Sequence, residues 1–112
     1  MIDSYSFGRI VIDGKKYTKD LIIYPDRVDD SWWREEGHKL SISDIKKVLE
    51  KKPEVLVVGQ GSPGLMKVLP ETKQRLEKES IELLIRPTKE ACGIYNRLSP
   101  SRKVIALLHL TC

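Results

Sequence analysis

The sequence predicts a single α/β domain, in which a largely parallel sheet is covered by helices and an antiparallel β-hairpin is added near the N-terminus. From residue 41 onward, short apolar runs alternate with segments whose apolar residues recur at helical spacing, as in βαβ units. Asp13-Gly14 separates two short runs of strand character and suits the tight turn of a hairpin. A chain of 112 residues is long enough for one ordinary hydrophobic core.

Residues 1–40 are predicted to be β structure and loop. The hairpin strands are expected at residues 7–12 and 15–17, and residues 21–24 are a further apolar strand that ends at Pro25. Residues 26–39, here called the tryptophan loop, read DRVDDSWWREEGHK and show no steady period. We expect this loop to be held in place by Trp32 or Trp33. Long loops in compact domains are often functional.

Residues 41–112 are predicted to alternate between helices and strands. A first helix, over residues 42–49, is capped by Ser41 or Ser43 and stopped by Pro53. Strands are expected at residues 55–58, 81–85 and 104–110, with a helix from residue 70 to residue 79 between the first two. Thr88 is predicted to cap a third helix. This alternation implies parallel strands that are buried on both faces.

Composition and charge narrow the class of protein. Hydrophobic residues at 40% and charged residues at 32% are typical of a soluble globular protein. The net charge of +4 arises from segments in which lysine and glutamate alternate, without a basic stripe that carries aromatic residues, so a nucleic-acid partner is not expected. Abundant lysine and glutamate, together with a single asparagine, resemble the composition of thermophile proteins.

The sequence favours a cytoplasmic location without membrane association. The first fourteen residues lack the basic and apolar regions of a secretory signal. The longest apolar run, residues 104–108, is far too short to cross a bilayer. Cys92 and Cys112 do not make a disulfide framework and are most simply two thiols in a reducing compartment.

A glycine-rich loop follows the apolar run of residues 55–58. Residues 59–64 read GQGSPG, which matches the G-x-G-x-x-G spacing of a dinucleotide-binding loop. Three features argue against a dinucleotide: Pro63 removes a backbone donor, the next helix begins only near Pro70, and Arg86 stands where an acidic residue would contact the ribose. The simplest alternative is a loop that needs glycine for its backbone geometry alone.

A smaller anion is the better ligand hypothesis for this loop. Because parallel strands place their carboxyl ends at one sheet edge, residues 59–62 are expected beside the end of the strand at residues 81–85. Backbone donors, hydroxyls and one fixed positive charge would meet there. The predicted ligand-binding residues are Gly59, Gly61, Ser62, Arg86 and Thr88.

The sequence supports a thiol–imidazole pair or a metal site less well than it supports the anion site. His109 and Cys112 could form a thiol–imidazole pair only if the chain bends after Leu110, because residues three apart in a strand point to opposite faces. Cys92, on a predicted helix face, is expected to be packed and inert. The two histidines are far apart and no CxxC is present, so no metal site is expected. We predict no catalytic residue and no cofactor.

The chain resembles a small α/β domain family of unknown function, the "Mth-type" family, over nearly its whole length. The resemblance rests on the ordered set FGRIVIDGKKY, DLIIYP, W-R-x-x-G-H-x-L, PEVLVVGQG, RPTKEA-x-x-x-YN and ALLHLTC. The family includes the adipogenesis-associated domain protein and mitochondrial complex I assembly factor three. It implies a three-layer domain with a mixed central sheet and an added β-hairpin layer, and it implies no established enzymatic activity.

Two functions of different classes follow from these observations. The first is a non-catalytic interaction or assembly module that binds an unidentified protein partner through Trp32, Trp33 and His38. The alternative is binding of a small anionic metabolite or nucleotide fragment, with or without catalysis, at Gly59–Ser62 and Arg86. An exposed tryptophan in an apolar patch would favour the first, and a lined concavity beside an unpaired Arg86 would favour the second.

Overall fold

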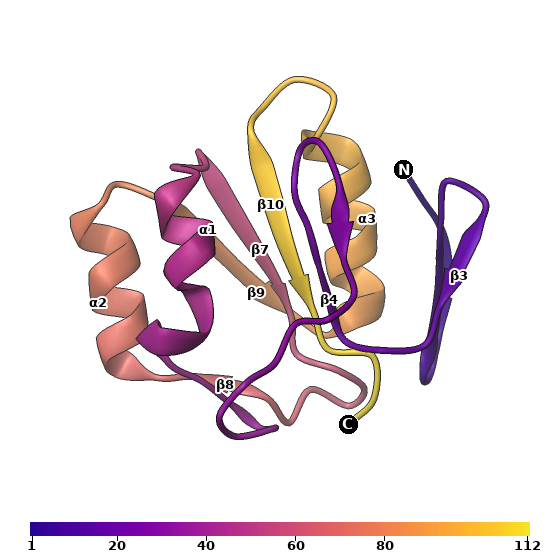
Figure 1. Ribbon diagram of the computed structural model, residues 1–112, viewed down its shortest axis with the longest axis horizontal. Coiled ribbons are helices and arrows are strands. Elements are labelled where there is room, and N and C mark those ends of the chain that lie inside the picture. Colours follow the sequence, from indigo (N-terminus) through magenta and orange to yellow (C-terminus); the bar gives the residue numbers. More distant parts are fainter.

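The computed structural model describes all of residues 1–112 and shows a mixed α/β domain built on a five-stranded sheet. The strand order is β5-β4-β10-β7-β9 (Figure 1). Strand β10 is parallel to β7, which is parallel to β9, while β4 is antiparallel to β10. These strands are β4 Leu21–Ile23, β5 Val28–Asp29, β7 Val55–Gly59, β9 Glu82–Arg86 and β10 Val104–Leu108. The predicted α/β class and mixed central sheet are confirmed.

Three helical segments and two small sheets complete the fold. The helices are a 3-10 turn η1 at Ile42–Ile45 that continues into α1 at Lys46–Glu50, then α2 at Pro70–Lys78 and α3 at Thr88–Leu98. An antiparallel meander contains β1 Ile2–Ser6, β2 Arg9–Ile12 and β3 Lys15–Tyr17, and a parallel pair contains β6 Lys39–Leu40 and β8 Lys67–Val68. The predicted N-terminal hairpin is therefore the second half of a three-stranded meander.

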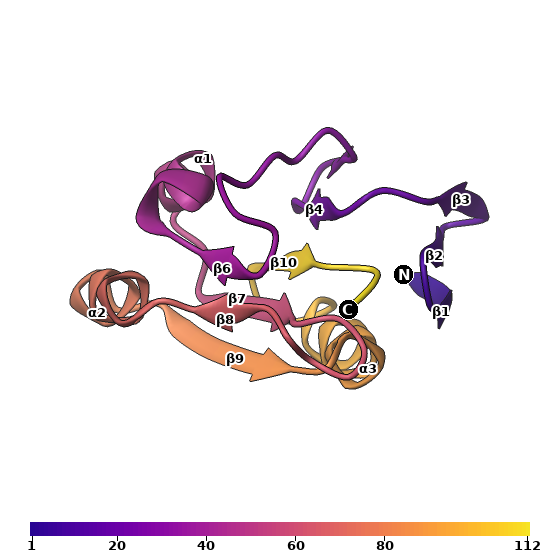
Figure 2. The ribbon, with the colours of Figure 1, turned by 90° about the horizontal axis from the view of Figure 1, so that it is seen from below.

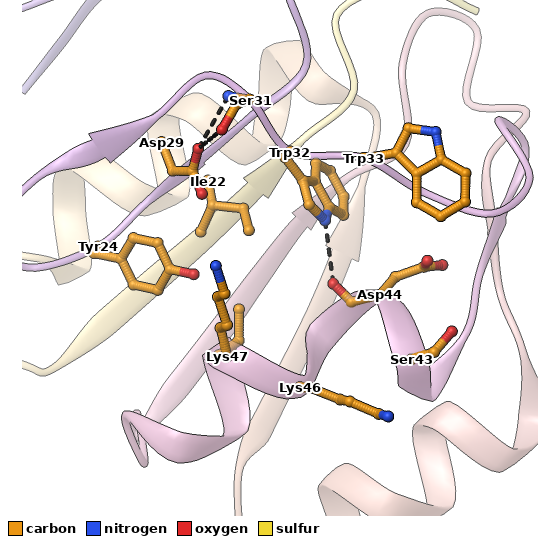
Figure 3. Close-up of a pocket in the computed structure, with 11 residues that line it drawn as sticks. Ile22, Tyr24, Asp29, Ser31, Trp32, Trp33, Ser43, Asp44, Lys46 and Lys47 are labelled. Atoms are coloured by element: carbon orange, nitrogen blue, oxygen red, sulfur yellow. Dashed lines mark hydrogen bonds between the residues drawn. The ribbon is translucent and has the colours of Figure 1, made fainter.

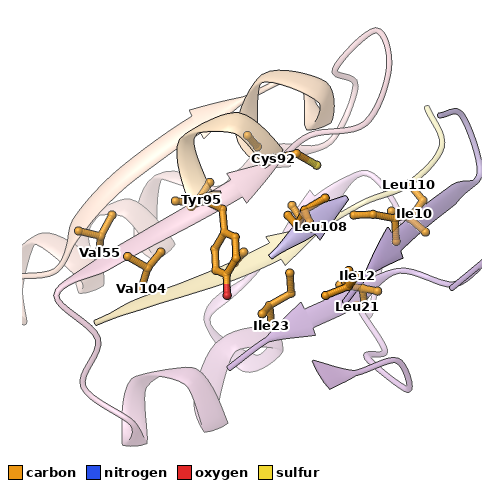
Figure 4. Close-up of a cluster of buried hydrophobic side chains, with 14 residues drawn as sticks. Ile10, Ile12, Leu21, Ile23, Val55, Cys92, Tyr95, Val104, Leu108 and Leu110 are labelled. Carbon is orange, nitrogen blue, oxygen red and sulfur yellow. The ribbon is translucent and has the colours of Figure 1, made fainter. Parts of the chain in front are cut away.

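Side chains on the two faces of the central sheet enter two separate cores, because successive residues of a strand point to opposite faces. Val55 and Val57 pack with α3 and the meander (Figure 4), whereas Leu56 and Val58 pack with α1 and α2. Figure 2 shows α1 and α2 on one side and α3 with β1–β3 on the other. All five residues of β7 and all five of β10 are buried, which explains their uninterrupted apolar runs.

The N-terminal cap was predicted correctly for η1 but not for α3. Ser41, one of the two serines that the sequence offered as a cap, is the N-cap of η1, and the Asp44 carboxylate accepts the Ser41 N–H at 2.9 Å. The predicted cap of α3 is wrong. Pro87 is the N-cap, and Thr88 is the first helical residue, with a buried hydroxyl that forms hydrogen bonds outside its own helix.

Strand β10 ends at Leu108, two residues earlier than expected.

Candidate functional site

The carboxyl ends of β7 and β9 lie side by side and bring together most of the residues predicted to bind a ligand. Gly59 is paired with Arg86 across the two strands. The Gly61 N–H donates to Thr88 Oγ1 at 2.8 Å, and Thr88 Oγ1 donates to the His109 carbonyl at 2.6 Å. The Ser62 N–H donates to the Thr111 carbonyl at 2.9 Å. The donors that an anion would need are thus engaged within the protein.

The two glycines are required by close packing at this edge. A β-carbon on Gly59 would lie 2.8 Å from Thr88 Oγ1, so glycine lets α3 approach the end of β7. At Gly61, φ is +92° and a β-carbon would lie 2.1 Å from the Thr111 carbonyl oxygen. No cavity is lined by any of the five predicted ligand residues. The anion site therefore stays a prediction.

Arg86 is exposed at the end of β9 and forms no ion pair. Its Nη1 donates to the carbonyl of the preceding residue, Ile85, at 2.7 Å. Every salt bridge of the protein involves other residues. The charge of Arg86 is therefore available to a partner outside this chain.

A buried charged cluster, formed by Asp20, Arg34 and His109, lies next to the same sheet edge. Asp20 Oδ2 is 2.7 Å from His109 Nδ1 and 2.8 Å from Arg34 Nη2. Asp20 Oδ1 accepts the Leu110 N–H at 2.8 Å. The side chains of Arg34 and His109 are only 6% and 7% exposed. The cluster joins three segments that are far apart in the sequence: the link before β4, the tryptophan loop and the residues after β10.

The hydrogen bonds of this cluster assign its proton positions. A 2.7 Å contact with a carboxylate places the proton of His109 on Nδ1, so the 3.2 Å contact of Arg34 Nη2 with that nitrogen is not a hydrogen bond. Burial alone raises the pKa of Asp20, but hydrogen bonds from His109, the Leu110 N–H and Arg34 outweigh it and lower the pKa to about 2. Asp20 is thus a carboxylate that fixes an imidazole and a guanidinium.

The cluster is closed to substrate in this structure. His109 Nε2 and Arg34 Nε are buried and have no hydrogen-bond partner. The exposed His38 ring stands edge-on to His109, with ring centroids 6.0 Å apart. His38, which the sequence grouped with the two tryptophans, therefore lies at this cluster, whereas Trp32 and Trp33 line a cavity that does not include it.

That cavity, here called the tryptophan cavity, lies between the tryptophan loop, β4 and η1–α1 (Figure 3). Its volume is about 370 Å³. Trp32 is half-buried, donates its Nε1–H to the Asp44 carbonyl at 3.2 Å and carries the Arg34 guanidinium 4.7 Å above its ring. Trp33 is 73% exposed. The residues that line the cavity are Ile22, Tyr24, Asp29, Ser31, Trp32, Trp33, Ser43, Asp44, Lys46, Lys47 and Val48.

Tyr24 is a buried residue that lines the tryptophan cavity. Its hydroxyl is buried and has no hydrogen-bond partner, and burial raises the pKa of that hydroxyl. The Arg27 guanidinium lies 4.4 Å above its ring. No pattern in the sequence marks Tyr24, Asp20 or Arg34 as site residues, since each acquires its surroundings only through contacts between distant segments. Figure 3 shows Tyr24 and Lys47 with their polar ends directed toward one another.

We expect the two thiols to differ strongly in reactivity. Burial raises the pKa of Cys92 to about 11, while Cys112 is exposed. Because the thiolate is the reactive species, Cys92 should be inert in the folded protein. Titration with a chromogenic disulfide reagent at pH 8 should detect one thiol in the native protein and two in denaturant. Rapid modification of both thiols in the native protein would contradict the packing of α3.

A family comparison matches nearly the whole of this structure. A family model described as "Protein of unknown function (DUF498/DUF598)" matches residues 2–109. The chain belongs to the DUF498/DUF598 family. This confirms the predicted resemblance to a domain family of unknown function, and the family description assigns no activity.

Solved structures of other proteins share the fold of this chain. The conserved hypothetical protein PH1505 from Pyrococcus horikoshii OT3 is 32% identical, with a TM-score of 0.86, over 100% of this chain and 99% of that one. A Bartonella henselae protein named as an outer membrane protein is 25% identical, with a TM-score of 0.79, over 99% and 94%. Xanthomonas campestris XCC1710, at 18% identity and a TM-score of 0.83 over 98% and 83%, supports the fold alone.

The helices of this family member are short. The longest, α3, has 11 residues, and no helix has the length and apolar character that are needed to cross a bilayer.

Proposed function

We propose that this protein is a non-catalytic interaction module that binds a protein partner at the tryptophan cavity. The observation that carries the proposal is Trp33, an indole that is 73% exposed at the mouth of a cavity of about 370 Å³. Tryptophan is among the residues that most often dominate the energy of protein interfaces. Of the other large exposed apolar residues, Phe7 and Leu65 line no cavity, and Met1 lines a separate one of about 260 Å³.

The cavity is built like the centre of an interface. Apolar residues that line it include Ile22 on β4 and Val48 on α1, and charged residues of both signs line it as well. Trp32 is held by its hydrogen bond to Asp44 and by the stacked Arg34. Because this side chain is already ordered, binding of a partner would cost little conformational entropy here. The expected partner inserts an apolar or aromatic side chain against Trp32 and places polar groups near Lys46 and Lys47.

The charged cluster supports this proposal indirectly. Arg34 contacts both Asp20 and the Trp32 ring, and therefore connects the cluster to the wall of the cavity. His109 Nε2 is enclosed and reaches no cavity, so the cluster is better suited to holding the tryptophan loop than to acting on a substrate. The alternative function, an anion at Gly59–Ser62 and Arg86, stays a prediction.

The cytoplasm is the location that we propose with this function. Cys92 and Cys112 are free thiols, which suits a reducing compartment. The Bartonella henselae relative carries a different description, which applies to that protein.

Photo-crosslinking tests the proposed surface. With benzoylphenylalanine at position 33, we expect a discrete crosslinked partner in the native host, and with the same residue at the exposed Phe7 we expect none of that product. The partner, once identified by mass and purified, should lose about tenfold or more in affinity for Trp33→Ala and none for Phe7→Ala. Equal affinities for the two variants would exclude the tryptophan cavity as the binding surface.

A further inference from the structure

Strand β9 forms an open edge of the central sheet. It pairs only with β7, and Figure 2 shows no segment beyond it. The Glu82 N–H and the Arg86 carbonyl bond toward β7, at Glu54 and Gln60. By the alternation of a parallel ladder, the backbone groups of Leu83 and Ile85 point outward. Five residues without proline or bulge thus present a regular, unpaired edge.

The other sheet edges are protected against pairing. Strand β5 has only two residues, and β3 carries Lys15 and Lys16. At β1, the Asn96 side chain accepts the Ile2 N–H and donates to the Ile2 carbonyl, both at 2.8 Å, so the edge groups of that residue are occupied. Strand β9 has five residues, carries its charged side chains only at its two ends, and leaves the apolar residues 83–85 between them uncovered by another strand. Its outward Ile85 carbonyl is contacted only by the neighbouring, exposed Arg86 side chain.

The sequence of β9, ELLIR, complements itself when two copies run antiparallel. With a two-fold axis at Leu84, Glu82 of each copy stands opposite Arg86 of the other. Opposite charges across a strand pair are stabilising, and Arg86 has no carboxylate partner within its own chain. Glu82, which lies 3.2 Å from Arg102 Nη1 within its own chain, would then also face Arg86 of the other copy. In the same register, Leu83 stands opposite Ile85, and each of these two pairs can exchange two hydrogen bonds through its outward-pointing backbone groups. Charge pairing and hydrogen bonding therefore select the same register.

We propose that two copies of this chain associate through β9, which joins their central sheets into one continuous sheet across a two-fold axis. The residues between Glu82 and Arg86 are apolar and only partly buried in the monomer, so pairing removes further apolar surface from water. The interface is separate from the tryptophan cavity, which lies between β4 and α1, and leaves that cavity free. A short strand interface of this kind is small, and the dimer is expected to be reversible.

Charge reversal at the two ends of β9 tests the register directly. Light scattering from about 10 µM to about 1 mM should show a mass that rises from that of the 12.9 kDa chain toward twice that value. Arg86→Glu places like charges opposite each other and should remain monomeric, as should Glu82→Arg. An equimolar mixture of these two variants should form a heterodimer, because each chain then meets only opposite charges. Arg97→Glu, an equal charge change on the exposed face of α3, should dimerise like the wild type.

The same measurements can overturn the proposal. A wild-type chain that stays monomeric at about 1 mM excludes it. A dimer that persists equally in Arg86→Glu and in Glu82→Arg, without a preference for the mixed pair, excludes β9 as its interface. If Trp33→Ala then abolishes that dimer, the second copy binds at the tryptophan cavity instead. Circular dichroism of each variant confirms that the fold is retained.

Discussion

Replacing Gly61 by alanine should destabilise the protein by at least about 3 kcal/mol, because two independent costs add at this position. The backbone has φ of +92°, a conformation that disfavours any β-carbon. The new methyl would also stand 2.1 Å from the Thr111 carbonyl oxygen and 2.7 Å from His109 Cδ2, and a backbone carbonyl cannot turn aside as a flexible side chain can. Relief of the clash requires residues 109–111 to move away from the glycine loop.

Urea unfolding followed by circular dichroism measures this effect, and Gly93→Ala is the matched control. Gly93 lies in the middle of α3, and a β-carbon there would meet nothing within 4 Å. Because alanine is the better helix former, Gly93→Ala should stabilise the protein by about 0.5–1 kcal/mol. If Gly61→Ala unfolded within about 1 kcal/mol of the wild type, the close approach of residues 61 and 111 would be wrong.

Removal of the Asp20 carboxylate is the second large effect that we expect. Asp20→Ala leaves the buried Arg34 guanidinium without its carboxylate, with only the Gly37 carbonyl as acceptor, and leaves the Leu110 N–H without its acceptor, at a cost of about 3 kcal/mol. Asp26→Ala removes the same charge from an exposed position that makes no ion pair, and should change stability by less than about 0.5 kcal/mol. The loss should also loosen the tryptophan loop, so Trp32 fluorescence is expected to shift toward that of an exposed indole.

The pH dependence of stability identifies Asp20 as the responsible group. Its pKa is about 2 in the folded protein and 3.8 in the reference state, so the unfolded chain binds this proton first as the pH falls. The contribution of Asp20 is therefore complete above about pH 4 and is lost as the pH decreases toward 2, with a total of about 2 kcal/mol. Asp20→Ala should lack this part of the acid transition. An unchanged acid transition in the variant would show that Asp20 is not held as a carboxylate.

Elements with strong local patterns were predictable from the sequence. The apolar runs of β7 and β10 had to be buried on both faces, and the helical spacing of α3 was visible in Ala91, Tyr95 and their neighbours. Strand β1 was missed, since only Ile2 among its five residues is buried and its pairing with β2 shifts register. The two-residue strands β6 and β8 have no pattern to detect, because they exist only where the Lys39 and Lys67 segments meet.

The sequence by itself determined the class of this fold, the order of its main helices and strands, and the glycine positions at which the backbone turns after β7. Only the tertiary structure decided which tryptophan is held and which is exposed, since Trp32 and Trp33 are adjacent in a loop without a period. It likewise brought together Asp20 and His109, 89 residues apart, and left the edge of β9 unpaired. Local periodicity records which face of an element is buried, whereas charged clusters, cavities and sheet edges depend on which distant segments become neighbours.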